Sequence, residues 1–186
     1  MNFSDKFDAG LEYHSFLQKH GSDTQRQNWQ TVHQQVKLKP AQRKLLSSFI
    51  RDMRVLVLAG TWCGDCVNQC PIFDHFAKAS PRIGIHFFER DEDPELGQHL
   101  MTCGAVRVPA VLFLSEDNFV CGRYGDRTLA KYREMMASQL GSSCPSGIGG
   151  EDQTLLNDVT TDWLKEFERI QWMLRLSPRL RNQHGD

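Results

Sequence analysis

The sequence predicts an α/β fold, a mixed sheet of about four strands flanked by helices, with extra helices at both ends. Two short apolar runs rich in β-branched residues alternate with segments of helical spacing, as buried parallel strands do. Two further strands are separated only by a tight connection, so they can form an antiparallel hairpin. With 186 residues, 40% of them hydrophobic, the chain is long enough for one domain plus appended helices.

The first 40 residues are expected to form a helical N-terminal extension. Apolar residues at helical spacing predict one helix that ends at Gly21: Phe3, Phe7, Leu11, Phe16 and Leu17. Residues 22–38 predict a second helix, with Ser22 and Asp23 as caps, and Pro40 begins a third.

Residues 41–140 contain the predicted sheet. The expected strands are 54–60, 83–89, 110–115 and 119–125. The expected helices are 67–79, a short one over 93–104 that ends at Gly104, and 126–140, which begins at the cap Asp126. The first two strands should be joined by a helical crossover.

The C-terminal part is predicted to contain a linker loop and an amphipathic helix. Residues 141–153 are a loop by composition. Residues 154–186 form an amphipathic helix and a solvated tail, and the helix carries one apolar stripe: Leu156, Val159, Trp163, Phe167, Ile170 and Leu174. This stripe should pack against the sheet domain or a partner.

Three cysteines lie within "GTWCGDCVNQCP", between a predicted strand and a predicted helix: Cys63, Cys66 and Cys70. Unpaired amides at a helix N-terminus favour a thiolate, so the pKa of Cys63 should be lowered. Cys66 lies about one turn deeper, where it could displace whatever Cys63 captures. Structural zinc would require a second CxxC or a histidine pair, although Cys70 could complete a three-thiol metal or cluster site.

The other cysteines carry weaker expectations. Cys70 is most simply a buried small residue, with a regulatory or second resolving role as the alternative. Cys103 and Cys121 should be structural, and Cys144, in a Gly- and Ser-rich loop, could be exposed and oxidisable.

"TWCGDC" following "VLVLAG" resembles the active-site strand and turn of thioredoxins, whose WCGPC differs only at Asp65. Pro71 matches the proline of the thioredoxin active-site helix, and Val108–Pro109 matches the dipeptide that contains the cis-proline. The resemblance covers about residues 41–140, and "FDAGLEYHSFL" is similar to the helical extension of a bacterial branch of thioredoxin-like proteins.

The resemblance implies a role for each matching residue. Cys63 would be the nucleophile and Cys66 the resolving thiol. The substrate-binding residues would be Trp62 as an apolar rim, Gly64, Asp65, Val108 with its backbone toward the thiols, and a cis Pro109.

Two residues depart from the thioredoxin pattern. Val57 stands where thioredoxins usually hold a buried Asp, and Asp65 replaces the proline between the cysteines. The Asp65 charge should oppose a thiolate at Cys63, which favours a reductant, and Asp65 could take over the proton-transfer role. On this reasoning Asp65→Pro lowers the pKa of Cys63.

We therefore expect a thiol–disulfide oxidoreductase that uses Cys63 and Cys66 to reduce protein disulfides, with a thiol or a reductase as electron donor and without cofactor or metal. The alternatives are a thiol peroxidase and a thioredoxin-fold binding or scaffold module. A net charge of −1 gives no attraction to nucleic acid or membrane. The start of the chain has no signal-peptide pattern and no run is long enough to span a bilayer, so a cytoplasmic location is expected. A homodimer through the terminal helices stays open.

Overall fold

A computed structural model describes residues 1–140 and 152–186 of the chain. At its centre is a four-stranded sheet of order β2-β1-β3-β4. β1 (Met53–Ala59) pairs in parallel with β2 (Ile83–Glu89) and antiparallel with β3 (Ala110–Ser115). β3 in turn pairs antiparallel with β4 (Val120–Gly125), through a turn in which Asn118 has a φ of 68°. The predicted mixed sheet and its hairpin are confirmed.

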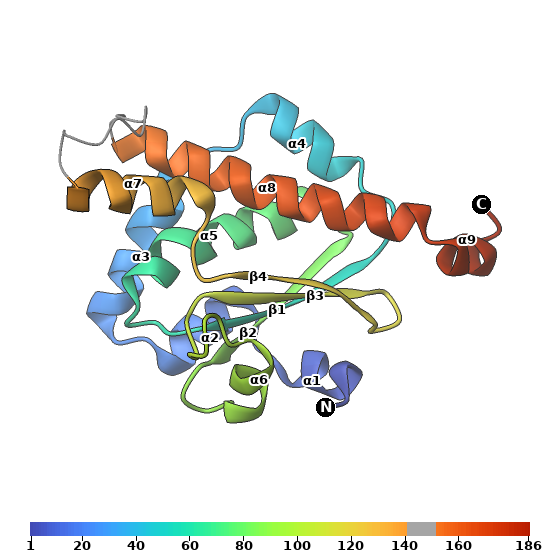
Figure 1. The fold of residues 1–186 in the computed structure, drawn as a ribbon, viewed down its shortest axis with the longest axis horizontal. Coiled ribbons are helices and arrows are strands. Elements are labelled where there is room, and N and C mark those ends of the chain that lie inside the picture. The colour runs from blue at the N-terminus through green and yellow to red at the C-terminus, as the bar shows by residue number, and fades with distance from the viewer. Residues whose placement is uncertain (141–151) are drawn as a thin grey trace.

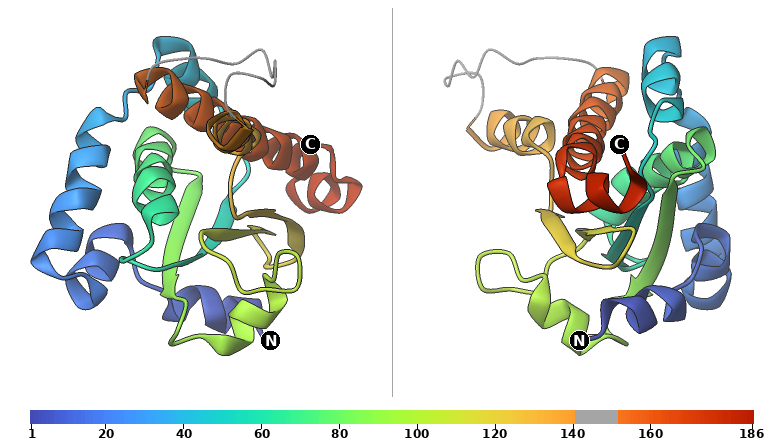
Figure 2. Two further views of the ribbon diagram at one scale, coloured as in Figure 1. Left: turned by 60° about the vertical axis from the view of Figure 1, so that its left-hand side comes forward. Right: turned by 90° about the vertical axis from the view of Figure 1, so that its right-hand side faces the viewer.

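Helices surround the sheet. In chain order they are α1 (Phe3–Ala9), α2 (Tyr13–His20), α3 (Asp23–Gln35), α4 (Pro40–Ser47), α5 (Gly64–Ala79), α6 (Pro94–His99), α7 (Leu129–Leu140), α8 (Asp152–Leu176) and α9 (Pro178–His184). Helices α5 and α8 lie over one face of the sheet, with α4 beyond them, while α1 and α6 lie on the other side (Figures 1 and 2). Helix α3 packs beside α5, and α2 packs against β2.

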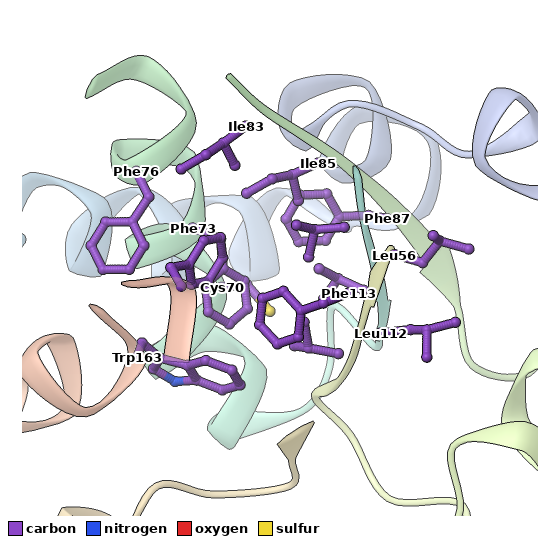
Figure 3. Close-up of a cluster of buried hydrophobic side chains, with 14 of the residues drawn as sticks. Leu56, Cys70, Phe73, Phe76, Ile83, Ile85, Phe87, Leu112, Phe113 and Trp163 are labelled. Atoms are coloured by element: carbon purple, nitrogen blue, oxygen red, sulfur yellow. The ribbon is translucent and has the colours of Figure 1, made fainter. Parts of the chain in front are cut away.

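A large part of the core lies between α5, α8 and the sheet, and helices α1 to α4 bury further apolar side chains in the same cluster. Phe73 of α5 meets Trp163 of α8 edge to face, with ring centroids 4.6 Å apart. Phe167 of α8 makes the same kind of contact with Phe113 of β3, at 5.1 Å. Figure 3 shows Phe73, Trp163 and Phe113 gathered with apolar side chains of the sheet such as Ile85. Because Trp163 and Phe167 are fully buried, the stripe predicted on the C-terminal helix packs against the chain's own sheet.

The prediction of one helix over the first 20 residues is wrong, because two separate helices, α1 and α2, form there. The backbone of Leu11 exchanges two hydrogen bonds with Phe87, of 3.1 and 2.7 Å, and so adds a short bridge to the edge of β2. Gly10 permits this approach, since a Cβ there would lie 2.6 Å from His86 and Phe88. Pairing with the sheet edge therefore overrides the helical spacing.

Other boundaries also differ from the sequence prediction. Helix α7 begins at Leu129 rather than at the predicted cap Asp126, and at its start the Lys131 N–H donates to the Thr128 hydroxyl at 3.4 Å. Helix α6 ends at His99, and Gly104, at a φ of 74°, belongs to a separate turn closed by a Thr102–Ala105 bridge. The predicted C-terminal tail instead contains α9, which begins at the cap Ser177 and buries Leu180 almost completely. The predicted linker at 141–153 falls mainly outside the described residues, and Cys144 lies outside them.

Helix α7 contributes no fully buried side chain among its described residues. Its described side chains are all exposed or half-buried, and it packs on α8. Among residues 1–140 and 152–186, no helix combines the length and the apolar character needed to span a bilayer.

Candidate active site

Cys63 lies where β1 gives way to α5, at the helix N-cap position. Its side chain is half-buried, whereas Cys66 and Cys70, on the following turns of α5, are completely buried. All five cysteines within the described residues are free thiols. A molecule in solution can therefore reach Cys63 and cannot reach the other two.

The two thiols of the CxxC motif contact each other. A side-chain hydrogen bond between Cys63 and Cys66 raises the pKa of the Cys63 thiol, and burial raises it further. The backbone amides of Cys66 and Asp65 point at the Cys63 sulfur and lower this pKa, but the upward effects prevail. The prediction of a lowered pKa for Cys63 is therefore wrong, because the Cys66 thiol and burial outweigh the helix amides. For Cys66, burial raises the pKa most, and its hydrogen bond with Cys70 adds to that.

The loop before β3 supplies a backbone acceptor to the dithiol. The Val108–Pro109 peptide bond is cis, as the resemblance implied. The Cys63 thiol donates to the Val108 carbonyl oxygen at 3.5 Å, so the start of this loop lies beside the Cys63 sulfur. Gly125 of β4 faces this loop at a φ of 141°, where an added Cβ would lie 2.5 Å from the Pro109 carbonyl oxygen. The cis-proline loop is therefore packed closely against β4.

Trp62 forms part of the exposed surface beside Cys63, with 47% of its area accessible. The Arg90 guanidinium lies 4.3 Å from the centre of the indole ring, and the indole N–H donates to Glu89 at 3.3 Å. Gly64 opens α5, and a Cβ there would meet no atom within 4 Å. Both residues thus lie where a substrate segment could pass.

Asp65 is paired with a residue that the sequence analysis did not single out. Its carboxylate lies 2.6 Å from Nη2 of Arg127, which sits in the turn between β4 and α7. The same guanidinium lies 3.2 Å from Asp126, a carboxylate that is almost completely buried and also accepts a hydrogen bond from Tyr132. No local pattern marks Arg127, because its partner comes from another part of the chain. Val57 is buried in β1, so that position supplies no carboxylate.

Both terminal extensions hold the site through a buried indole. Trp29 of α3 donates its ring N–H to the Thr61 carbonyl at 2.9 Å, two residues before Cys63. Trp163 of α8 donates to Gln69 of α5 at 2.8 Å, and Gln69 donates to the Asp126 carbonyl at 3.1 Å. Sequence patterns placed both tryptophans on helices but did not identify these contacts.

The other described cysteines, Cys103 and Cys121, lie away from Cys63 in the sequence. Cys103 is exposed in the turn after α6, and the half-buried Cys121 contacts the Phe119 carbonyl. Over residues 1–140 and 152–186, no group of three or more His, Cys, Asp and Glu side chains has a metal-binding arrangement. This finding covers Cys63, Cys66 and Cys70.

Comparison with known proteins gives one family and two similar folds over most of the chain. A family model described as thioredoxin matches residues 10–140. A protein of unknown function from Pseudomonas aeruginosa superposes with a TM-score of 0.73 at 21% identity, over 91% of this chain and 96% of that one. An HIV epitope-scaffold superposes with a TM-score of 0.67 at 23% identity, over 89% and 98% of the two chains. At these identities the superpositions establish the thioredoxin-like fold alone. No curated protein matches the chain.

Proposed function

Because the chain belongs to the thioredoxin family, we propose that it is a thiol–disulfide oxidoreductase that uses Cys63 and Cys66 to reduce disulfides in protein substrates. The observation that carries the proposal is the contact between a thiol open to solvent and a buried thiol one turn along the same helix. The first can attack a substrate, and the second can act only on what the first has bound.

The reaction needs only sulfur chemistry and protons. The Cys63 thiolate attacks one sulfur of the substrate disulfide, whose bond breaks, and the departing substrate thiolate takes up a proton. Cys66 then loses its proton and attacks the Cys63 sulfur of the mixed disulfide. A Cys63–Cys66 disulfide forms, and the second substrate thiol is released. The substrate gains two electrons and two protons, and an external dithiol must return them to the protein.

The surroundings of Cys63 suit an extended peptide as substrate. The Val108 carbonyl and the cis-proline loop lie on one side of the sulfur, and the exposed Trp62 indole lies close by in sequence and on the surface. A substrate segment that passes over Cys63 would meet backbone polar groups and one large apolar ring. Both are features of surfaces that bind peptides without a deep pocket.

An insulin reduction assay with dithiothreitol as donor tests the proposal. The wild-type chain should accelerate insulin precipitation, Cys63→Ser should fall to the rate of dithiothreitol alone, and Cys66→Ser should accumulate the mixed disulfide. Cys103→Ser, which removes an exposed thiol outside the site, should behave like the wild type.

A wild-type chain that is no faster than dithiothreitol alone, and that never forms a Cys63–Cys66 disulfide on oxidation, would refute the proposal. Retained binding of a partner by Cys63→Ser under those conditions would instead support the scaffold alternative.

A further inference from the structure

Arg127 forms an ion pair with Asp65, one of the two residues between Cys63 and Cys66. Its guanidinium reaches Asp65 at 2.6 Å and Asp126 at 3.2 Å. The Asp65 and Arg127 side chains are only 17% and 21% exposed, so the pair is partly shielded from salt and water. The buried Nε of Arg127 has no hydrogen-bond partner. The two carboxylates are therefore the ionic contacts that hold this side chain in place.

Asp65 acts on Cys63 in two opposite ways. Its backbone amide points at the Cys63 sulfur and favours the thiolate. Its carboxylate carries a negative charge two residues away and opposes the thiolate by repulsion. The first effect depends on the backbone at the start of α5, whereas the second depends on whether the carboxylate charge is offset.

We propose that Arg127 is a positioning residue for the redox step, which pairs with the Asp65 carboxylate and so relieves its repulsion of a thiolate at Cys63. The inference rests on the proposed function, because it concerns the ionisation of the same nucleophile. In the thioredoxin motif a proline at the position of Asp65 restrains the backbone. Here the side chain of Asp65 is instead held by an ion pair with Arg127, from the turn after β4.

Two neighbours outside the ion pair also act on the charge at Cys63. They are the Cys66 thiol and Arg90, whose guanidinium interacts electrostatically with Cys63. Arg90 already stacks on Trp62 and pairs with Asp91 at 2.8 Å. Since these contacts do not involve Asp65, removal of Arg127 leaves them in place.

The two members of the pair should have opposite effects when removed singly. Arg127→Gln leaves the Asp65 charge uncompensated, so the pKa of Cys63 rises. Asp65→Asn removes the negative charge near Cys63 and leaves Arg127 paired with Asp126 alone, so this pKa falls. Each pKa unit changes the thiolate fraction about tenfold below the titration midpoint, while thiolate nucleophilicity changes about threefold the other way, which leaves a net change of about threefold.

Alkylation of the full-length reduced protein by iodoacetamide measures this effect, with the Cys63 peptide quantified by mass spectrometry between pH 6 and pH 10. Below the wild-type midpoint, Arg127→Gln should slow Cys63 alkylation about threefold and Asp65→Asn should accelerate it about threefold. The double variant should return close to the wild-type rate.

Arg107→Gln is the matched control. This exposed arginine pairs with Asp126 at 3.3 Å, so its removal takes a positive charge from the same cluster without unpairing Asp65. In Arg107→Gln, the pH midpoint of Cys63 alkylation should stay at the wild-type value.

The two single variants should change the rate of Cys63 alkylation in opposite directions. Loosening of the turn alone would change both rates in the same direction. Equal-signed shifts, or rates within 1.5-fold of the wild type in both variants, would overturn the inference. Failure of the proposed function is recognised separately, by the absence of a Cys63–Cys66 disulfide in the oxidised wild-type chain.

Discussion

Replacement of Trp29 by phenylalanine should destabilise the protein by about 3 kcal/mol. Trp29 is fully buried, and its ring N–H donates to the Thr61 carbonyl at 2.9 Å. Thr61 is itself buried, so its carbonyl would lose a partner that water cannot replace, at a cost of about 1–3 kcal/mol. The smaller ring also leaves about two buried carbon atoms fewer, worth about 1.5 kcal/mol at about 0.8 kcal/mol each.

Urea unfolding followed by far-ultraviolet circular dichroism measures this change without relying on tryptophan fluorescence. For a chain of this length the midpoint of thermal unfolding should fall by about 6–12 °C. Trp172→Phe, which alters a tryptophan that is 42% exposed, is the control and should change the unfolding free energy by less than about 0.5 kcal/mol. A loss below 1 kcal/mol for Trp29→Phe would refute the view that α3 supports the loop before Cys63.

Three further predictions concern other parts of the fold. Burial raises the pKa of Asp74, but hydrogen bonds from Lys78 and His33 bring it below its ordinary value of 3.8. The stabilisation from the ionised Asp74 carboxylate is thus complete above about pH 4 and is lost as the pH falls further. In acid titrations followed by circular dichroism, Asp74→Asn should therefore lose less stability between pH 4 and pH 2 than the wild type does. Gly125→Ala should lower the melting temperature more than Gly104→Ala, since both sites have positive φ but only the first would bring a Cβ against backbone; equal losses would contradict the close packing at Gly125. Leu180→Ala should lower the unfolding free energy by about 2–5 kcal/mol in urea, and a neutral result would show that α9 does not dock.

Local sequence signals predicted the sheet and the position of the dithiol. β1 is a continuous apolar run because both faces of a central strand are covered, and Cys63 follows it after a short turn. The strand–turn–helix order then places Cys63 at a helix N-cap without further information. The cis peptide at Pro109 could be expected only from the resemblance to thioredoxins, since nothing in its neighbours alone requires it.

Features that depend on distant contacts were not predictable in the same way. The break at Gly10 results from pairing with Phe87 on β2, which competes successfully with helical periodicity. The pairing of Asp65 with Arg127 joins a helix start to a turn that follows β4, and a single sequence gives no indication of which charges meet. The upward shift in the pKa of Cys63 arises because its neighbour is another thiol in a buried position, an effect that outweighs the helix amides.

The terminal extensions and the central part of the chain form the site together. An indole from α3 holds the loop before Cys63, while an indole from α8 holds Gln69 on α5. Gln69 also binds the backbone of Asp126, next to the arginine that pairs with Asp65, so α8 supports the charged turn as well as the helix. Both indoles are fully buried, and removal of either extension would expose an apolar surface together with unpaired polar groups. The geometry at Cys63 therefore depends on segments at both ends of the chain, although neither extension contributes a reacting atom.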